Sequence, residues 1–135
     1  MADQPSQHNL VLILARNFAS HLATAVFLVD AVGSVIYFNE AAERLLGARF
    51  VEGRGMTREE YTELFEVSDE RGERIAVMDT PLGIAIGRHE PSHMKLRLRG
   101  FDGVRRPIEA TAFPLLAHTD ELVGAIAIFW EPAGS

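Results

Sequence analysis

The chain opens with apolar side chains at helical spacing. Between residues 9 and 22 the large apolar residues stand four positions apart, as Leu10, Leu14, Phe18 and Leu22. Val11 and Ile13 widen this stripe, and most of the remaining positions are polar or small. Spacing of this kind is typical of a helix with one apolar face. The pattern therefore predicts an amphipathic helix over residues 9–22.

The next segments have the composition of strands and short helices. An apolar run over residues 25–29 and a β-branched and aromatic run over residues 35–38 flank Gly33, which predicts a hairpin. Asn39 has the position of a helix N-cap and Gly47 that of a helix end, so we expect a short helix between them. Further short helices are predicted after the capping box at residues 57–60 and over residues 80–87.

Towards the C-terminus the hydrophobic period changes to two. Met94, Leu96 and Leu98 alternate with basic residues, which predicts a half-buried strand. After turns rich in glycine and aspartate, residues 105–116 and 122–130 are expected to form two more strands. The predicted order is one helix, two strands, three short helices and three strands.

The last two predicted strands are apolar on both faces. In the first of them one face carries Ile108, Ala110 and Ala112, and the other carries Thr111, Phe113 and Leu115. An antiparallel sheet with water on one side alternates more cleanly between apolar and polar residues. We therefore expect the N-terminal helix, a second subunit, or both to cover the outer face.

Two blocks of the sequence resemble the PAS family. The first contains the apolar strand from Ala25, the Asp30-Ala-Val-Gly33 turn, Asn39 and the helix that ends in Leu45-Leu-Gly47. The second contains Thr80-Pro-Leu82, the Lys95-Leu-Arg-Leu-Arg-Gly-Phe-Asp-Gly103 turn, Phe113-Pro-Leu115 and the closing apolar strand. The likeness runs from about residue 20 to residue 131.

The resemblance implies an α+β fold of the PAS type. Such a fold has a five-stranded antiparallel sheet with short helices on one face that enclose a pocket, and it supports ligand sensing and dimerisation. With the N-terminal helix added, we expect a disordered N-terminus at 1–8, the helix at 9–22, the PAS domain at 23–131 and a loose C-terminus at 132–135. The chain lacks the Asp-x-Thr-like turn of members fused to a kinase or cyclase, so we expect it to act in trans or to be an excised piece.

The resemblance also suggests residues for a ligand pocket and for a dimer interface. The pocket candidates are Tyr61, Phe65, Met78, Leu82, Ile86 and His89, and for all of them except His89 plain core packing is the favoured interpretation. His89 lies just beyond a helix that carries a haem-ligating histidine in some relatives, so haem is a candidate cofactor. The position of His89 past the end of this helix, instead of on it, argues against haem. The homodimer candidates are Leu10, Leu14, Phe18, Leu22 and Phe113.

Composition excludes several classes of function. The chain of 135 residues has no cysteine, which rules out disulfides, thiolate metal sites and cysteinyl-flavin chemistry. Its net charge of −6 argues against nucleic-acid binding, which needs a basic face. No apolar run approaches the ~18 residues of a membrane span, and no signal sequence is evident. We expect a cytoplasmic protein with neither nucleic-acid nor membrane partners.

Two polar motifs allow both a structural and a functional interpretation. The segment His89-Glu90-Pro-Ser-His93 spells the H-E-x-x-H zinc signature, but Pro91 opposes the helix that this metal site requires, so we predict a loop. Basic residues also gather around the hairpin predicted at 94–116, where they fit a solvated strand face or a docking site for an acidic partner or anionic ligand. They are Lys95, Arg97, Arg99, Arg105 and Arg106.

Together these features indicate a non-catalytic sensory module. We expect it to bind a small ligand, to form a homodimer and to regulate a signalling protein in trans. A structural adaptor whose pocket is filled by its own side chains is the alternative. A zinc-dependent enzyme is a distant third hypothesis, since it depends on the signature of His89, Glu90 and His93 alone.

Overall fold

A computed structural model of the protein describes residues 7–50, 56–57, 59–61, 65–117 and 120–132. Residues 133–135 of the predicted loose C-terminus at 132–135 and the first six residues of the predicted disordered N-terminus at 1–8 lie outside this part. Gln7 and His8, which the same prediction included, lie in the first helix. In chain order the elements are α1 (Gln7–Ser20), β1 (Ala25–Asp30), β2 (Val35–Phe38), α2 (Glu40–Leu46), β3 (Glu66–Ser68), the 3-10 helix η1 (Val77–Asp79), α4 (Pro81–Arg88), β4 (Ser92–Arg99), β5 (Arg105–Leu116) and β6 (Leu122–Trp130).

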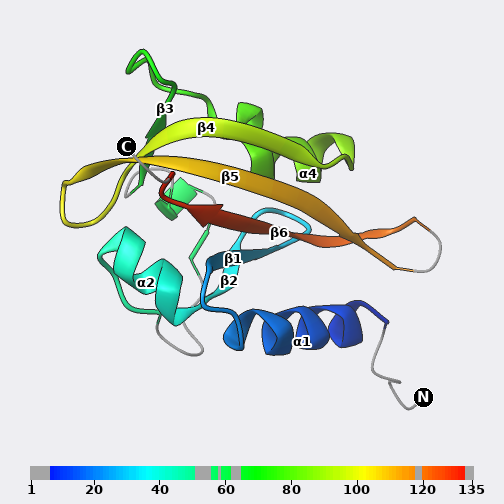
Figure 1. The fold of residues 1–135 in the computed structure, drawn as a ribbon. Helices are drawn as coiled ribbons and strands as arrows, with labels where there is room; N and C mark the ends of the chain where they lie inside the picture. Colours follow the sequence, from blue (N-terminus) through cyan, green and yellow to red (C-terminus); the bar gives the residue numbers. More distant parts are fainter. Residues whose placement is uncertain (1–6, 51–55, 58, 62–64, 118–119, 133–135) are drawn as a thin grey trace.

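The strands form one curved antiparallel sheet in the order β2-β1-β6-β5-β4-β3 (Figure 1). The predicted α+β fold is confirmed, but within the described residues the sheet has six strands, so the predicted number of five was wrong. The additional strand is β3, which pairs with the end of β4 from Glu66 opposite Arg99 to Ser68 opposite Arg97. A three-residue edge strand has too few positions to give an alternating pattern, so its pairing depends on contact with β4.

Helix-capping signals in the sequence act as expected. The side chain of Asn39 accepts a hydrogen bond from the Ala42 N–H at 3.0 Å and caps α2. Gly47 ends this helix with φ of 69°, a left-handed conformation that glycine adopts without steric cost. Thr57 and Glu60 form the predicted capping box, in which each backbone N–H donates to the other side chain, at 2.9 and 3.1 Å.

The sheet buries side chains on both of its faces. On the inner face the core lies between the sheet and the short helices, and it includes Phe27, Phe38, Leu96 and Phe129. On the outer face a second core lies under α1 and includes Val26, Leu28 and Ile126. The expectation that the N-terminal helix covers part of the outer face is therefore confirmed.

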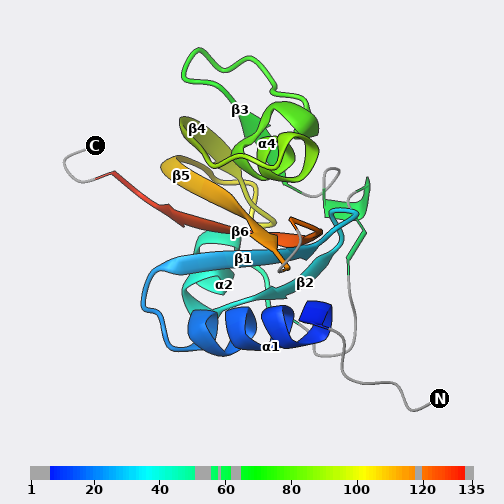
Figure 2. The same ribbon diagram turned by 90° about the vertical axis from the view of Figure 1, so that its right-hand side faces the viewer.

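Helix α1 packs on the sheet through residues outside the predicted stripe. Leu12, Ala15 and Ala19 contact the outer core, and Leu22 joins them from the turn after the helix. Figures 1 and 2 both show α1 alongside β1 and β2, at the opposite end of the sheet from α4. None of the helices in the described residues is long and apolar enough to cross a membrane.

Candidate functional site

A partly open cavity of about 110 Å³ lies between the inner face of the sheet and a second wall that runs from Phe65 to Leu82 and includes Tyr61. Most of its wall is apolar. The sheet contributes Phe27, Leu96, Leu98, Ile108 and Phe129, and the opposite wall includes Phe65, Ile75, Val77 and Leu82. The sheet side is buried, whereas Ile75, Val77 and Leu82 are partly exposed, so the cavity opens towards this second wall.

Strand periodicity explains the sheet side of the cavity. Leu96 and Leu98 point inward on β4, and Leu96 lies opposite Ile108 of β5 in the register of the sheet. Two inward positions, Ala110 and Ala127, carry the smallest apolar side chains in the lining. We attribute the unfilled space to these alanines, because larger residues at the same positions would extend into it.

The polar groups around the cavity already have partners. Thr80 caps α4: its hydroxyl donates to the Val77 carbonyl at 2.6 Å and accepts from the Gly83 N–H at 3.2 Å. Arg74 also lines the cavity, and it is exposed at the open side. Within the described part of the chain, every buried side-chain nitrogen and oxygen has a hydrogen-bond partner.

Three of the six predicted pocket residues line the cavity, namely Tyr61, Phe65 and Leu82. Met78 is 43% exposed and Ile86 packs against the inner core, and neither reaches the lining. His89 is exposed at the end of α4 and also lies outside it. The lining residues that were not predicted include Leu96 and Leu98 on β4, Ile108 and Ala110 on β5, and Ala127 and Phe129 on β6. The alternation of these strands was visible in the sequence, but the shared position of the residues around one cavity was not.

His89 and His93 do not form the sites that a zinc or haem function requires. Helix α4 ends at Arg88 and β4 begins at Ser92, so no helix presents His89 and His93 on one face. The Nε2 atom of His93 instead lies 3.1 Å from a carboxylate oxygen of Glu109 on β5. Neither histidine lines the cavity, so neither is placed to ligate an iron held there.

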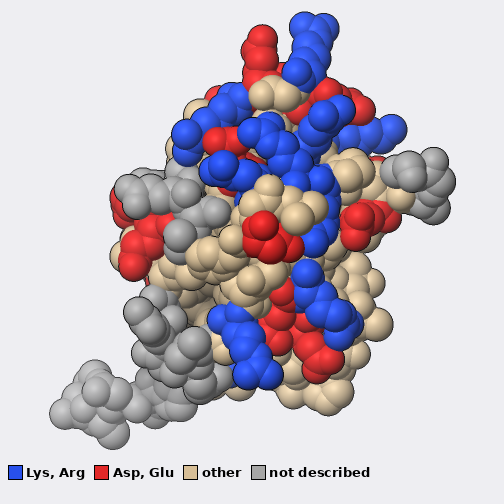
Figure 3. All heavy atoms as spheres, turned by 90° about the vertical axis from the view of Figure 1, so that its left-hand side faces the viewer, with Lys and Arg blue, Asp and Glu red and all other residues tan. Residues whose placement is uncertain are grey.

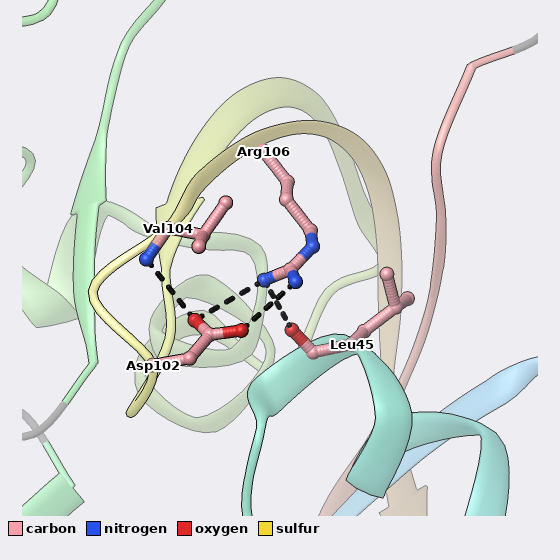
Figure 4. Close-up of polar contacts among 4 residues, drawn as sticks. All are labelled: Leu45, Asp102, Val104 and Arg106. Carbon is pink, nitrogen blue, oxygen red and sulfur yellow. Dashed lines mark hydrogen bonds and ion pairs between the residues drawn. The ribbon is translucent and has the colours of Figure 1, made fainter.

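The turn between β4 and β5 docks on the end of α2, beside the cavity. The Phe101 N–H donates to the carbonyl of Leu46, a cavity-lining residue, at 2.8 Å. Arg106 donates to the carbonyl of Leu45 at 3.1 Å and forms an ion pair with Asp102 at 2.9 Å (Figure 4). Arginine at a helix C-terminus also interacts favourably with the helix dipole.

The ion pair changes the titration of both groups. The hydrogen bond from Arg106 holds the pKa of the Asp102 carboxyl below its usual value, with a further contribution from the Val104 N–H at 3.0 Å. The same contact raises the pKa of the Arg106 guanidinium. The pair is therefore ionised at neutral pH, and its attraction is screened by salt because Asp102 is exposed.

The predicted interface residues divide between two environments. Leu10, Leu14 and Phe18 are 52%, 58% and 55% exposed, and Ile13 beside them is 62% exposed. Leu22 instead packs against the protein's own sheet. Phe113 is 37% exposed on the outer face of β5, opposite Ile126 in the register.

The basic residues of the β4–β5 hairpin also divide. Arg106 points to α2, as described above, whereas Arg99 and Arg105 both pair with Glu66, at 3.6 and 3.0 Å. Lys95 and Arg97 are exposed on the outer side of β4. Figure 3 shows Lys and Arg side chains gathered in the upper part of the face that it views, with acidic side chains among them.

Solved structures with a similar fold include several PAS domains. The PAS domain of a Colwellia psychrerythraea protein has 18% identity and a TM-score of 0.62, over 93% of this chain and 99% of that one. The LOV protein of Rhodobacter sphaeroides has 15% identity and a TM-score of 0.68, over 98% of this chain and 70% of that one. The light-state dimer of the fungal photoreceptor Vivid has 17% identity and a TM-score of 0.60, over 97% of each chain.

A search of curated protein sequences found no match. The family model described as the PAS fold matches residues 14–130, which include the cavity-lining residues and the β4–β5 turn. The sequence motifs, the sheet order and the position of the cavity all agree with this match. The chain therefore belongs to the PAS family.

Proposed function

We propose that this chain is a sensory module that binds a small molecule in its cavity and makes or breaks no covalent bond. PAS domains are sensory signalling modules and are generally not catalytic. The observation that carries the proposal is the partly open apolar cavity, with a helix on one side and the strands that support α1 on the other. A ligand that prefers one arrangement of these walls would shift the population towards that arrangement.

The sheet offers a short route from the cavity to α1. On β1, Phe27 lines the cavity, while its neighbours Val26 and Leu28 face the opposite way and contact the core under α1. On β6, Phe129 lines the cavity, and its neighbour Ile128 faces the opposite way and contacts the core under α1. A displacement of these strands therefore reaches both cores, and its size is limited by the differential affinity of the ligand for the two states.

We further propose that the exposed face of α1 pairs with a second copy of the chain. The exposed face of α1 carries an apolar stripe made of Leu10, Ile13, Leu14 and Phe18. Several exposed apolar side chains on one face indicate an interaction site, whereas scattered single ones do not. The guanidinium of Arg16 is turned away, 4.7 Å from the centre of the Tyr37 ring. A neutral stripe can lie against its own copy without repulsion between like charges. The fold forms dimers elsewhere, since the Vivid structure is a light-state dimer.

An adaptor without a ligand is the second candidate function. The volume of about 110 Å³ favours it, because pockets for drug-sized ligands have about 300 Å³ or more. In that case the exposed stripe of α1 and the outer face of the sheet would carry the function, and the partner would be a signalling protein acting in trans.

Native mass spectrometry of freshly purified protein tests the two candidates. The matched control is Ala110→Leu, which fills the cavity and leaves the surface unchanged. A dimer that carries extra non-protein mass, lost in Ala110→Leu, supports the sensor. A bare dimer in both samples supports the adaptor, and a bare monomer at micromolar concentration contradicts pairing through α1. An absorption spectrum of the same sample identifies any chromophore in the bound mass.

A further inference from the structure

The cavity is small on the scale of known ligand sites. Its volume of about 110 Å³ exceeds the 10–15 Å³ that one water molecule needs. It is smaller than an engineered apolar cavity of about 150 Å³ that binds benzene. Because this cavity is partly open, a ligand of that size can extend past Val77 and Leu82. The space fits a molecule of about one aromatic ring, whereas a haem or a flavin exceeds it several times.

The part of the lining that the structure describes contains no buried polar group that requires a ligand. The Thr80 hydroxyl both donates and accepts within the protein, as described above. Among the described residues, no buried side-chain nitrogen or oxygen is left without a partner. A polar ligand would lose hydrogen bonds to water and find few in return.

A charged ligand is disfavoured by the same walls. Among the described residues of the lining, Arg74 alone is cationic, and its exposed position keeps its charge near solvent at the open side. Against Phe27, Ile108 and Phe129 a carboxylate would be desolvated without a buried counter-charge. An apolar ligand gains the hydrophobic free energy of leaving water at no such cost.

We propose that the cavity binds an uncharged, apolar molecule of about the size of a single substituted aromatic ring. The inference deepens the proposed sensor function and depends on it, since an adaptor would have no ligand. It assigns Ala110 and Ala127 as the residues that set the ligand size, because their side chains face the unfilled space. The three phenylalanines of the lining, Phe27, Phe65 and Phe129, offer ring faces and edges for stacking.

Toluene and benzoate are the probes for the test, because they have nearly the same shape and differ in charge. Methyl NMR spectra of the full chain are recorded with each compound. Toluene is expected to shift the methyl signals of Leu82, Leu96 and Ile108, which line the cavity, more strongly than those of Leu12 and Leu115, which lie in the outer core under α1. Benzoate at the same concentration is expected to cause no such shifts.

Two variants locate the binding. Ala110→Leu is expected to weaken toluene binding at least about tenfold, and the exposed control Ala23→Leu is expected to leave it unchanged. If Ala110→Leu does not fold, Ala127→Leu and the NMR shifts give the same information. Tighter binding of benzoate than of toluene, lost in Arg74→Ala, would overturn the apolar ligand class and leave the sensor function standing. Absence of binding by both compounds, with a more stable Ala110→Leu, would overturn the ligand class and the sensor function together.

Discussion

The side-chain Nδ2 atom of Asn39 donates a hydrogen bond to the carbonyl oxygen of Ala19 at 3.0 Å. The same amide group donates to the carbonyls of Leu22 and Thr24 at 3.3 and 2.9 Å. Its oxygen accepts from one N–H on β1 and one on α2, both at 3.0 Å. One buried side chain thus joins the end of α1 to β1 and to the start of α2.

Replacing Asn39 by aspartate should detach α1 while keeping the cap of α2. Asn39→Asp retains an acceptor for the Ala42 N–H but places a second oxygen against three carbonyl groups. We expect the free energy of unfolding to fall by about 3 kcal/mol, because the buried carbonyls lose their donor and a charge is buried without a partner. Urea unfolding measures this loss, and hydrogen exchange should show faster exchange in α1. If Asn39→Asp lowers the free energy of unfolding no more than the exposed control Glu40→Gln does, the role of the amide is contradicted.

Charged residues on the exposed face of α1 should prevent pairing without unfolding the protein. Leu14→Asp and Phe18→Asp are expected to give a monomer in sedimentation velocity experiments, because each places a charge in the proposed interface. Both substitutions should change the stability of the monomer by less than about 0.5 kcal/mol.

The matched control for this prediction is Leu12→Asp, on the face of α1 that packs against the sheet. It should lower the free energy of unfolding by about 2 kcal/mol or more, since the new carboxylate lies against an apolar core. If Leu14→Asp and Phe18→Asp remain dimeric, the interface lies elsewhere on the chain.

Two glycines of α4 should respond in opposite directions to the same substitution. A Cβ atom on Gly83 would lie 2.2 Å from the Val77 carbonyl oxygen, so Gly83→Ala forces α4 away from η1. A Cβ atom on Gly87 would meet only the flexible end of Met78, at 3.0 Å. We expect Gly83→Ala to destabilise by about 2 kcal/mol and Gly87→Ala to stabilise by about 0.5 kcal/mol. Thermal unfolding of both variants distinguishes them, and a stabilising Gly83→Ala would contradict the close packing of α4 on η1.

The ion pair between Asp102 and Arg106 should stabilise the protein only while the carboxyl is ionised. The pKa of the Asp102 carboxyl is lowered in the folded state. The stabilisation by the ion pair is therefore fully present above the unfolded-state pKa of about 3.9, and it is lost as the pH falls through the lower folded-state pKa. The difference in melting temperature between the wild type and Asp102→Asn should therefore be constant from about pH 5 to 7 and decrease below about pH 4.

The double-mutant cycle with Arg106→Gln isolates this interaction. In the Arg106→Gln background, most of the pH-dependent difference caused by Asp102→Asn should disappear, because the largest cause of the lowered pKa has been removed. An unchanged difference would assign the effect to the hydrogen bond from Val104 instead.

Local signals explain why most of the fold was predictable. The period of two around Leu96 and the caps at Asn39 and Thr57 depend on residues that are close together in the chain, so they can be read without knowing the fold. Strand β3 was missed because it has three residues and pairs with β4 about thirty positions away. The turn η1 was missed because Val77–Asp79 has neither a side-chain cap nor a buried residue.

The cavity was only half predictable for a related reason. Short helical segments suggested Tyr61, Phe65 and Leu82, but their angle to the sheet decided that Met78 and His89 lie outside the lining. The sheet residues come from strands whose inward faces are apolar along much of their length. Which part of that surface remains unfilled depends on how α4 and the segment before it cross the strands.

By itself, the sequence determined the family, most of the strands, the helix caps and the two apolar faces of the C-terminal strands. The tertiary structure alone decided which side of α1 is buried. Leu12 and Leu14 are the same residue type two positions apart, and only the outer core beneath Leu12 distinguishes them. The hydrophobic effect has no direction, so periodicity reveals that apolar side chains will be buried, while the shape of the surface they meet decides which of them remain exposed for a partner.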